Sequence, residues 1–327
     1  MHTAKKGFLA NESGGVAVYM ALGLVVLLGC AALALDISHM VSVKRELTKA
    51  AEAGALAGAR GLWPTILPST SASRSPDCAA AQTWALNAAT ANQVDNANLT
   101  PSEVTVEVGQ WNYTTKQFTS GMGASANGVR VTTRRDQVPM IFAKIIGQYY
   151  RNMSATAIAI MDFADAVGQG TLPIAINQPF TDPGTALFIN FTPDPYDTGG
   201  WFANPPDTAS ARTFSDYINN AACAPLHVGD DINLQNGNDT SCLNDLKAKL
   251  AQQPEGHLDT LLPVVNTDKF NQNEPIVGFV PFRITSVQSS GNPKGVWGTV
   301  ISLAEMQSAL PGGGGNYGGL APPKLVQ

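Results

Sequence analysis

The stretch GGVAVYMALGLVVLLGCAALALD (residues 14–36) decides the architecture of this chain. From Val16 to Leu35 no residue carries a charge. As a helix that rises about 1.5 Å per residue, this run is long enough to cross the roughly 30 Å hydrocarbon core of a bilayer. We therefore predict a single transmembrane helix.

The helical pattern continues where the hydrophobicity ends. The next stretch, ISHMVSVKRELTKAAEAGALAGARGL (37–62), keeps small and apolar residues at helical spacing with charged residues between them. Pro64 then disfavours helix in the residue before it. We predict one unbroken helix from Val16 to Gly61, about 70 Å long at 1.5 Å per residue, whose second half protrudes from the membrane as a stalk.

Two ridges of small residues run along the predicted stalk. Such ridges allow another backbone to approach closely, either a helix of a partner subunit or a part of this protein's own globular domain. The candidate helix-packing residues are Ala50, Ala51, Gly54, Ala55, Gly58 and Ala59.

The apolar run also has two features of processed segments. Ala32-Leu33-Ala34 fits the small-x-small rule of signal peptidase, and Gly7-Phe8 with Glu12 has the spacing of prepilin cleavage sites. The run is longer than a signal-peptide core, and polar residues interrupt it after Phe8. Retention as a membrane anchor is the favoured interpretation.

Composition excludes several classes of function. The net charge of −5, without a basic run, gives nucleic-acid phosphates no surface to bind. The four histidines are isolated, and zinc-site, nucleophile-elbow and phosphate-loop motifs do not occur, so we predict no catalytic residue, no metal site and no cofactor. A small-molecule substrate is not expected.

The acidic stretch GDDINLQNGND (229–239) is a candidate calcium site, because it is rich in the hard oxygen ligands that calcium prefers. Its spacing is not that of an EF-hand, so turn formation is the better interpretation. The possible ligands are Asp230, Asp231, Asn233, Asn236, Asn238 and Asp239. Cys223 and Cys242 flank this polar loop, and a disulfide between them would stabilise it by about 3 kcal/mol. Two reduced thiols are the alternative.

The predicted fold class is α+β, with a mainly β distal unit. In the first domain, Ser75-Pro76 is expected to open a helix with Trp84 as its largest buried side chain. Alternating valines from Val104 to Val108 predict a strand, and 128–134 predicts another. The stretch 138–147 predicts a short apolar helix ended by Gly147. In the distal unit, strands are expected at 172–176, 185–191, 274–289 and 295–301, with one helix at 242–253.

These patterns divide the chain into six segments. The expected organisation is a cytoplasmic N-terminus (1–14), a transmembrane helix and stalk (15–62), a polar linker (63–76), an α+β domain (77–162), a mainly β distal domain (163–310) and a flexible Gly/Pro-rich tail (311–327).

The N-terminal segment resembles TadG-like proteins of the tight-adherence (Tad/Flp) pilus system. In that family a polar residue and Gly precede an apolar span that ends in Asp, followed by a basic residue, Leu and an alanine-rich stretch. The matching residues here are Gly15, Asp36, Lys44-Arg45, Leu47, Ala50-Ala51, the stretch from Ala55 to Ala59 and Arg60, with Glu52 where the family usually has Asp. The stretch from Val106 to Ile160 is similar to the domain that often follows.

The resemblance implies a single-pass inner-membrane protein with a cytoplasmic N-terminus and a periplasmic or cell-surface C-terminal domain. It implies a structural part in pilus assembly or secretion, with other Tad/Flp membrane proteins or pilin-like helices as partners, and no catalysis. The alternative from another class is an anchored periplasmic or surface binding protein that uses residues 165–310 to hold a glycan, a host surface or calcium.

Overall fold

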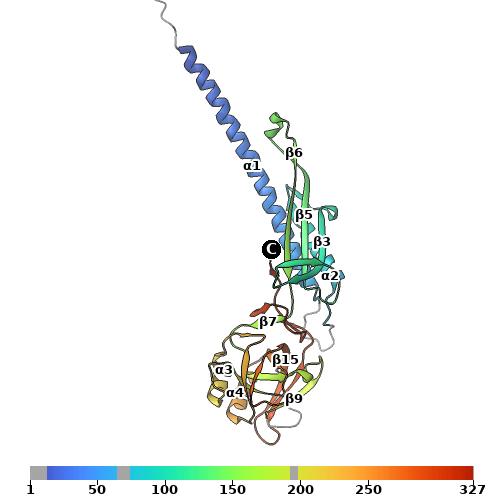
Figure 1. The fold of residues 1–327 in the computed structure, drawn as a ribbon, viewed down its shortest axis with the longest axis vertical. Helices are drawn as coiled ribbons and strands as arrows, with labels where there is room; N and C mark the ends of the chain where they lie inside the picture. Colours follow the sequence, from blue (N-terminus) through green and yellow to red (C-terminus); the bar gives the residue numbers. More distant parts are fainter. Residues whose placement is uncertain (1–12, 65–73, 192–197, 327) are drawn as a thin grey trace, which may run out of the picture.

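The computed structural model describes residues 13–64, 74–191 and 198–326. Figure 1 shows three parts along the long axis: a free length of helix α1, a head that packs on the rest of α1, and a distal unit at the opposite end. We define the head as residues 36–162 with 324–326, and the distal unit as residues 163–323. This arrangement confirms the predicted α+β fold class with a mostly β C-terminal part.

Helix α1 (Ser13–Gly61) is unbroken over 49 residues, which confirms the predicted continuous rod. Its two halves differ in environment. In the first, the most apolar 18-residue window has a mean hydropathy of 2.5 and none of it is buried. In the second, one face is covered by the head, with Val43 and Leu47 almost fully buried. The first half is therefore a candidate membrane helix, and the second half belongs to the core of the head.

The head is one antiparallel five-stranded sheet in the order β20-β6-β5-β3-β4, covered on one face by α1 and α2. Valines that alternate along β3 and β5 face the helices, as the period-two pattern predicted. The elements of the head are α2 (Cys78–Thr90), β1 (Gln93–Val94), β2 (Ala97–Asn98), η1 (Pro101–Glu103), β3 (Val104–Asn112), β4 (Gln117–Ser120), β5 (Gly128–Pro139), η2 (Ala143–Ile146), β6 (Tyr150–Ile160) and β20 (Lys324–Leu325).

Three expectations for the head are wrong in detail. Asp77, not Ser75, caps α2, since its carboxylate accepts the Ala80 N–H at 2.9 Å. Trp84 is 40% exposed instead of buried, because Ala81, Ala85 and Ala89 are the α2 residues that face α1, and Trp84 lies at the edge of that face beside Gly61. The expected helix at 138–147 is only the 3₁₀ turn η2, although it does end at Gly147, which has a φ of 81°.

The distal unit is built on an eight-stranded mixed sheet in the order β14-β12-β10-β8-β13-β15-β16-β9. Helices α3 and α4 pack on one face, where Trp201 stacks between Phe191 and Phe214. A three-stranded sheet, β11-β7-β18, contributes to a separate core. The elements are β7 (Ala164–Val167), β8 (Ile174–Asn177), η3 (Gln178–Phe180), β9 (Ala186–Asn190), β10 (Gly199–Ala203), α3 (Ala211–Asn220), β11 (Leu226–His227), β12 (Asp231–Gln235), α4 (Thr240–Ala251), β13 (Leu258–Val265), β14 (Asn273–Pro275), β15 (Gly278–Gln288), β16 (Gly295–Val300), β17 (Ala304–Glu305), β18 (Ala309–Pro311) and β19 (Gly319–Leu320).

The expected flexible tail is wrong. Leu320 and Ala321 are fully buried, and β20 returns to the head, where Lys324 pairs with Ile160 of β6. The glycines permit this close packing, because a Cβ at Gly314 would lie 2.1 Å from the Ala164 carbonyl oxygen. The distal unit is therefore inserted between two neighbouring strands of the head sheet.

The predicted linker is anchored at both of its described ends, while residues 65–73 lie outside the described residues, as does most of the predicted cytoplasmic N-terminus. Trp63 is buried, and its indole N–H donates to the Met161 carbonyl at 3.3 Å. The guanidinium of Arg74 donates to the carbonyls of Ser302 at 2.9 Å and Thr181 at 3.2 Å. Arg74 thus joins the linker to the distal unit.

The expected disulfide is also wrong, because Cys223 and Cys242 are free thiols that lie in different cores. Cys242 lies in the first turn of α4, and its thiol donates to the Ala211 carbonyl at 3.4 Å. The polar stretch between them, expected as a turn, contains strand β12 with Ile232 and Leu234 buried.

Candidate functional site

The small residues of the stalk make the closest contact between α1 and α2. A Cβ placed on Gly58 would lie 2.8 Å from the Ala85 Cβ, and one on Gly54 would lie 3.0 Å from the Ala89 Cβ. At Gly61 the nearest atom would be the Ala81 Cα, at 2.9 Å. Since the α2 residues decrease as the α1 residues increase, the two helices run antiparallel with almost no side chain between their backbones.

The same residues of the stalk also pack on the head sheet. Val129 and Val131 of β5 approach Gly58 and Gly54, where an added Cβ would meet a valine methyl at 2.8 and 3.2 Å respectively. Thr133 donates its hydroxyl to the Leu47 carbonyl at 2.9 Å. The stalk is thus enclosed between α2 and β5.

This placement decides between the two alternatives for the predicted ridges. Both ridges pack within the chain, on the protein's own α+β head, so they are not a free surface for a partner helix. The alanines among the predicted helix-packing residues, all fully buried, are Ala50, Ala51, Ala55 and Ala59.

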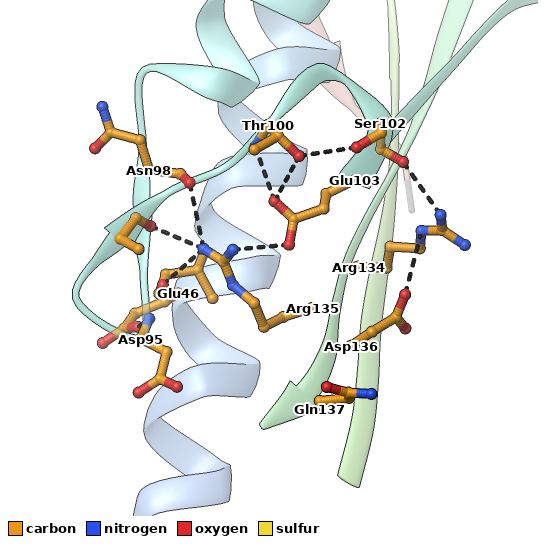
Figure 2. Close-up of polar contacts among 12 residues, drawn as sticks. Glu46, Asp95, Asn98, Thr100, Ser102, Glu103, Arg134, Arg135, Asp136 and Gln137 are labelled. Atoms are coloured by element: carbon orange, nitrogen blue, oxygen red, sulfur yellow. Dashed lines mark hydrogen bonds and ion pairs between the residues drawn. The ribbon is translucent and has the colours of Figure 1, made fainter. Parts of the chain in front are cut away.

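A polar cluster joins the side of α1 to the loops before β3 (Figure 2). Asp95 begins the two-residue turn between β1 and β2, and its N–H donates to the Glu46 carboxylate at 2.8 Å. Its own carboxylate lies 3.6 Å from His39 Nε2. Both turn residues, Asp95 and Asn96, have positive φ values of 52° and 61°, as a tight hairpin turn requires.

Arg135 is the centre of this cluster, as Figure 2 shows. Its guanidinium donates to the Glu103 carboxylate at 2.7 Å and to the carbonyls of Val94 and Ala97, each at 2.8 Å. Desolvation acts to raise the pKa of Glu103, but hydrogen bonds from Thr100 and the charge of Arg135 outweigh it, and this pKa lies below its ordinary value of 4.5. Arg135 therefore binds the hairpin, η1 and the sheet into one body beside α1.

Asp36 forms the contact nearest the candidate membrane segment. Its side chain is buried, and its carboxylate accepts backbone N–H groups of Ile141 at 2.7 Å, Phe142 at 3.0 Å and Ala143 at 2.6 Å. A carboxylate that accepts several N–H groups at the start of a helical turn satisfies donors that would otherwise be unpaired. Asp36 thus fixes the tip of the β5–β6 hairpin against α1 where the apolar run ends.

A second feature is a cavity of about 490 Å³ between the head and the glycines of the tail. Asp162 lies in its wall and accepts hydrogen bonds from Asn127 at 2.8 Å and Tyr113 at 3.0 Å. Desolvation raises the pKa of Asp162, although these hydrogen bonds oppose the effect, and burial beside Asp162 raises the pKa of Tyr113. The polar side chains of the wall hydrogen-bond to one another, and the glycines of the tail pack beside them.

The acidic residues considered for calcium have structural contacts. Asp239 caps α4 by accepting the Ser241 N–H at 3.0 Å, and Asp230 accepts the His227 N–H at 2.7 Å. Within the part of the chain that the structure describes, no group of three or more His, Cys, Asp or Glu side chains is placed to hold a metal ion.

The sequence patterns missed the roles of Asp36 and Arg135. The partners of Asp36 lie more than a hundred residues later in the chain. Its only local signal was a single acidic residue at the end of an apolar run.

The fold and these contacts define a class: a candidate membrane helix whose extramembrane half is built into an α+β head. Comparison with known families agrees with this class. Residues 14–61 match the Flp pilus-assembly TadE/G-like family, and residues 57–159 match the Tad-like Flp pilus-assembly domain. These matches support a TadE/TadG-like Tad pilus protein over residues 14–159. No curated protein and no solved structure matches it.

Proposed function

We propose that this protein is a structural, non-catalytic component of Tad/Flp pilus assembly or secretion, anchored in the inner membrane by the first half of α1. Its N-terminus lies in the cytoplasm, and its head and distal unit lie on the periplasmic or cell-surface side. The observation that carries this proposal is that one unbroken helix passes from an uncovered apolar segment into the core of the head. The membrane segment and the exported domain are therefore one rigid element.

This rigidity gives the head a mechanical task in the assembly. Since the stalk ridges are occupied by α2 and β5, partners of the apparatus contact either the apolar segment of α1 inside the bilayer or the outer surfaces of the head and the distal unit. The protein then acts as a rigid support that keeps the distal unit at a constant distance from the membrane.

Deletion of the gene in the bacterium that encodes the chain tests the assembly role. We expect the deletion strain to lose Flp-type pili in electron micrographs, and the wild-type gene to restore them. Normal piliation of the deletion strain, or release of the protein from membranes by carbonate, would contradict the proposal.

A further inference from the structure

The tip of the β5–β6 hairpin, residues 141–150, exposes an unusual amount of apolar surface. Ile145 is 85% exposed and Ile146 is 71% exposed, and Ile141, Tyr149 and Tyr150 are each more than half exposed. Contiguous apolar surface of this kind marks an interaction site on a folded protein.

The backbone of the tip is well formed, so these side chains are held outward. The Met140 N–H donates to the Tyr149 carbonyl at 2.9 Å, and the Ile145 N–H donates to the Phe142 carbonyl at 3.0 Å. Asp36 accepts the N–H groups of the next residues on the side toward α1. The shape of the tip is therefore independent of a partner.

The contacts along α1 place the tip at the level of the membrane surface. Leu47 of α1 lies beside Thr133 of β5, and Asp36, about 16 Å further along the helix axis, lies beside Ile141. As α1 approaches the apolar segment, the hairpin therefore approaches it too, and Figure 1 shows its tip beside the middle of α1. Asp36 directly follows the uncharged run that ends at Leu35.

We propose that this tip is a second membrane contact, which inserts Ile145 and Ile146 into the interfacial layer of the bilayer that α1 enters. This inference rests on the proposed membrane anchoring. Tyr149 and Tyr150 are residues of the type that lies at lipid headgroups. Lys144 and Arg151 are exposed on the same tip and complement the phosphates of anionic lipids. With α1 as one contact and the tip as another, the head has a defined tilt on the membrane.

Fluorescence quenching in proteoliposomes of phosphatidylethanolamine and phosphatidylglycerol tests the insertion. Ile145→Trp places an indole on the tip, and phospholipids brominated on the acyl chain quench indoles that reach them. The matched control is Met122→Trp, at a site that is 63% exposed and follows β4 at the opposite end of the sheet. The native tryptophans are the same in both variants.

We expect a blue-shifted emission and several-fold stronger quenching for the indole of I145W than for that of M122W, and weaker quenching when Ile146→Asp is added to I145W. Equal quenching in the two variants would overturn the proposal. A blue shift without quenching would also overturn it, because the tip would then be covered by protein. Flotation of the proteoliposomes separates this result from a failure of anchoring: if α1 is not an anchor, neither variant floats with the vesicles.

Discussion

Replacement of Gly58 tests the packing of the stalk most directly. In Gly58→Ala the new methyl would lie 2.8 Å from both the Ala85 Cβ and a Val129 methyl, and 3.2 Å from the Ala81 carbonyl oxygen. Such overpacking costs about 1–3 kcal/mol, and the better helix propensity of alanine returns about 1 kcal/mol. The net destabilisation is therefore about 1 kcal/mol, and Gly58→Leu, with three further carbons, should cost about 3 kcal/mol or more.

Thermal unfolding of the detergent-solubilised protein, followed by far-UV circular dichroism, measures both changes. For a unit the size of the head, each kcal/mol lowers Tm by about 4 °C, so G58L should unfold roughly 12 °C below the wild type. The control is Gly23→Ala, where nothing lies within 4 Å and Tm should not fall. An unchanged Tm in G58L would refute the packing, and loss of pili in that stable variant would assign the ridge to a partner helix.

The remaining predictions concern a carboxylate, two thiols and the tail. Folding lowers the pKa of Glu103, so the ionised carboxylate stabilises the folded protein fully above pH 4.5, and this stabilisation is lost as the pH falls through the pKa of Glu103 in the folded protein. In urea titrations, the difference in unfolding free energy between the wild type and Glu103→Gln should therefore become smaller below pH 4.5. A difference that stays constant with pH would contradict this. Burial raises the pKa of Cys223 to about 12 and that of Cys242 to about 11, so both thiols should resist alkylation at neutral pH until the protein is unfolded. A disulfide between them in a non-reduced mass spectrum would disprove this. Because Leu320 is fully buried, Leu320→Ala should destabilise the protein by about 2–5 kcal/mol. The control Leu310→Ala, at a site that is 54% exposed, should change stability by less than about 0.5 kcal/mol. Equal effects of the two changes on Tm would show that the tail is not part of the core.

The features that the sequence predicted well are local ones. The continuous helix follows from hydropathy and spacing within α1, and the strands around Val104 and Gly128 follow from alternation. The same alternation of apolar and polar residues occurs at Ile232 and Leu234, but the acidic residues around them favour a turn.

The features that it did not predict depend on contacts between distant segments. Burial of Trp84 was expected from its size, but a helix that packs through alanine and glycine has no room for a large side chain on that face. The glycine-rich tail indicated local freedom, whereas its structure comes from pairing with β6 far earlier in the chain. The capping of a distant loop by Asp36 has no local signature for the same reason.

The insertion of the distal unit between β6 and β20 determines how force passes through the protein. A unit held by a single covalent connection can swivel about it. Here the polypeptide enters and leaves the distal unit at adjacent strands of the head sheet, and Arg74 adds a separate tether from the α1–α2 connection. Torsion applied to the distal unit is therefore transmitted through the sheet to helix α1, so a turning load at one end of the molecule reaches the other.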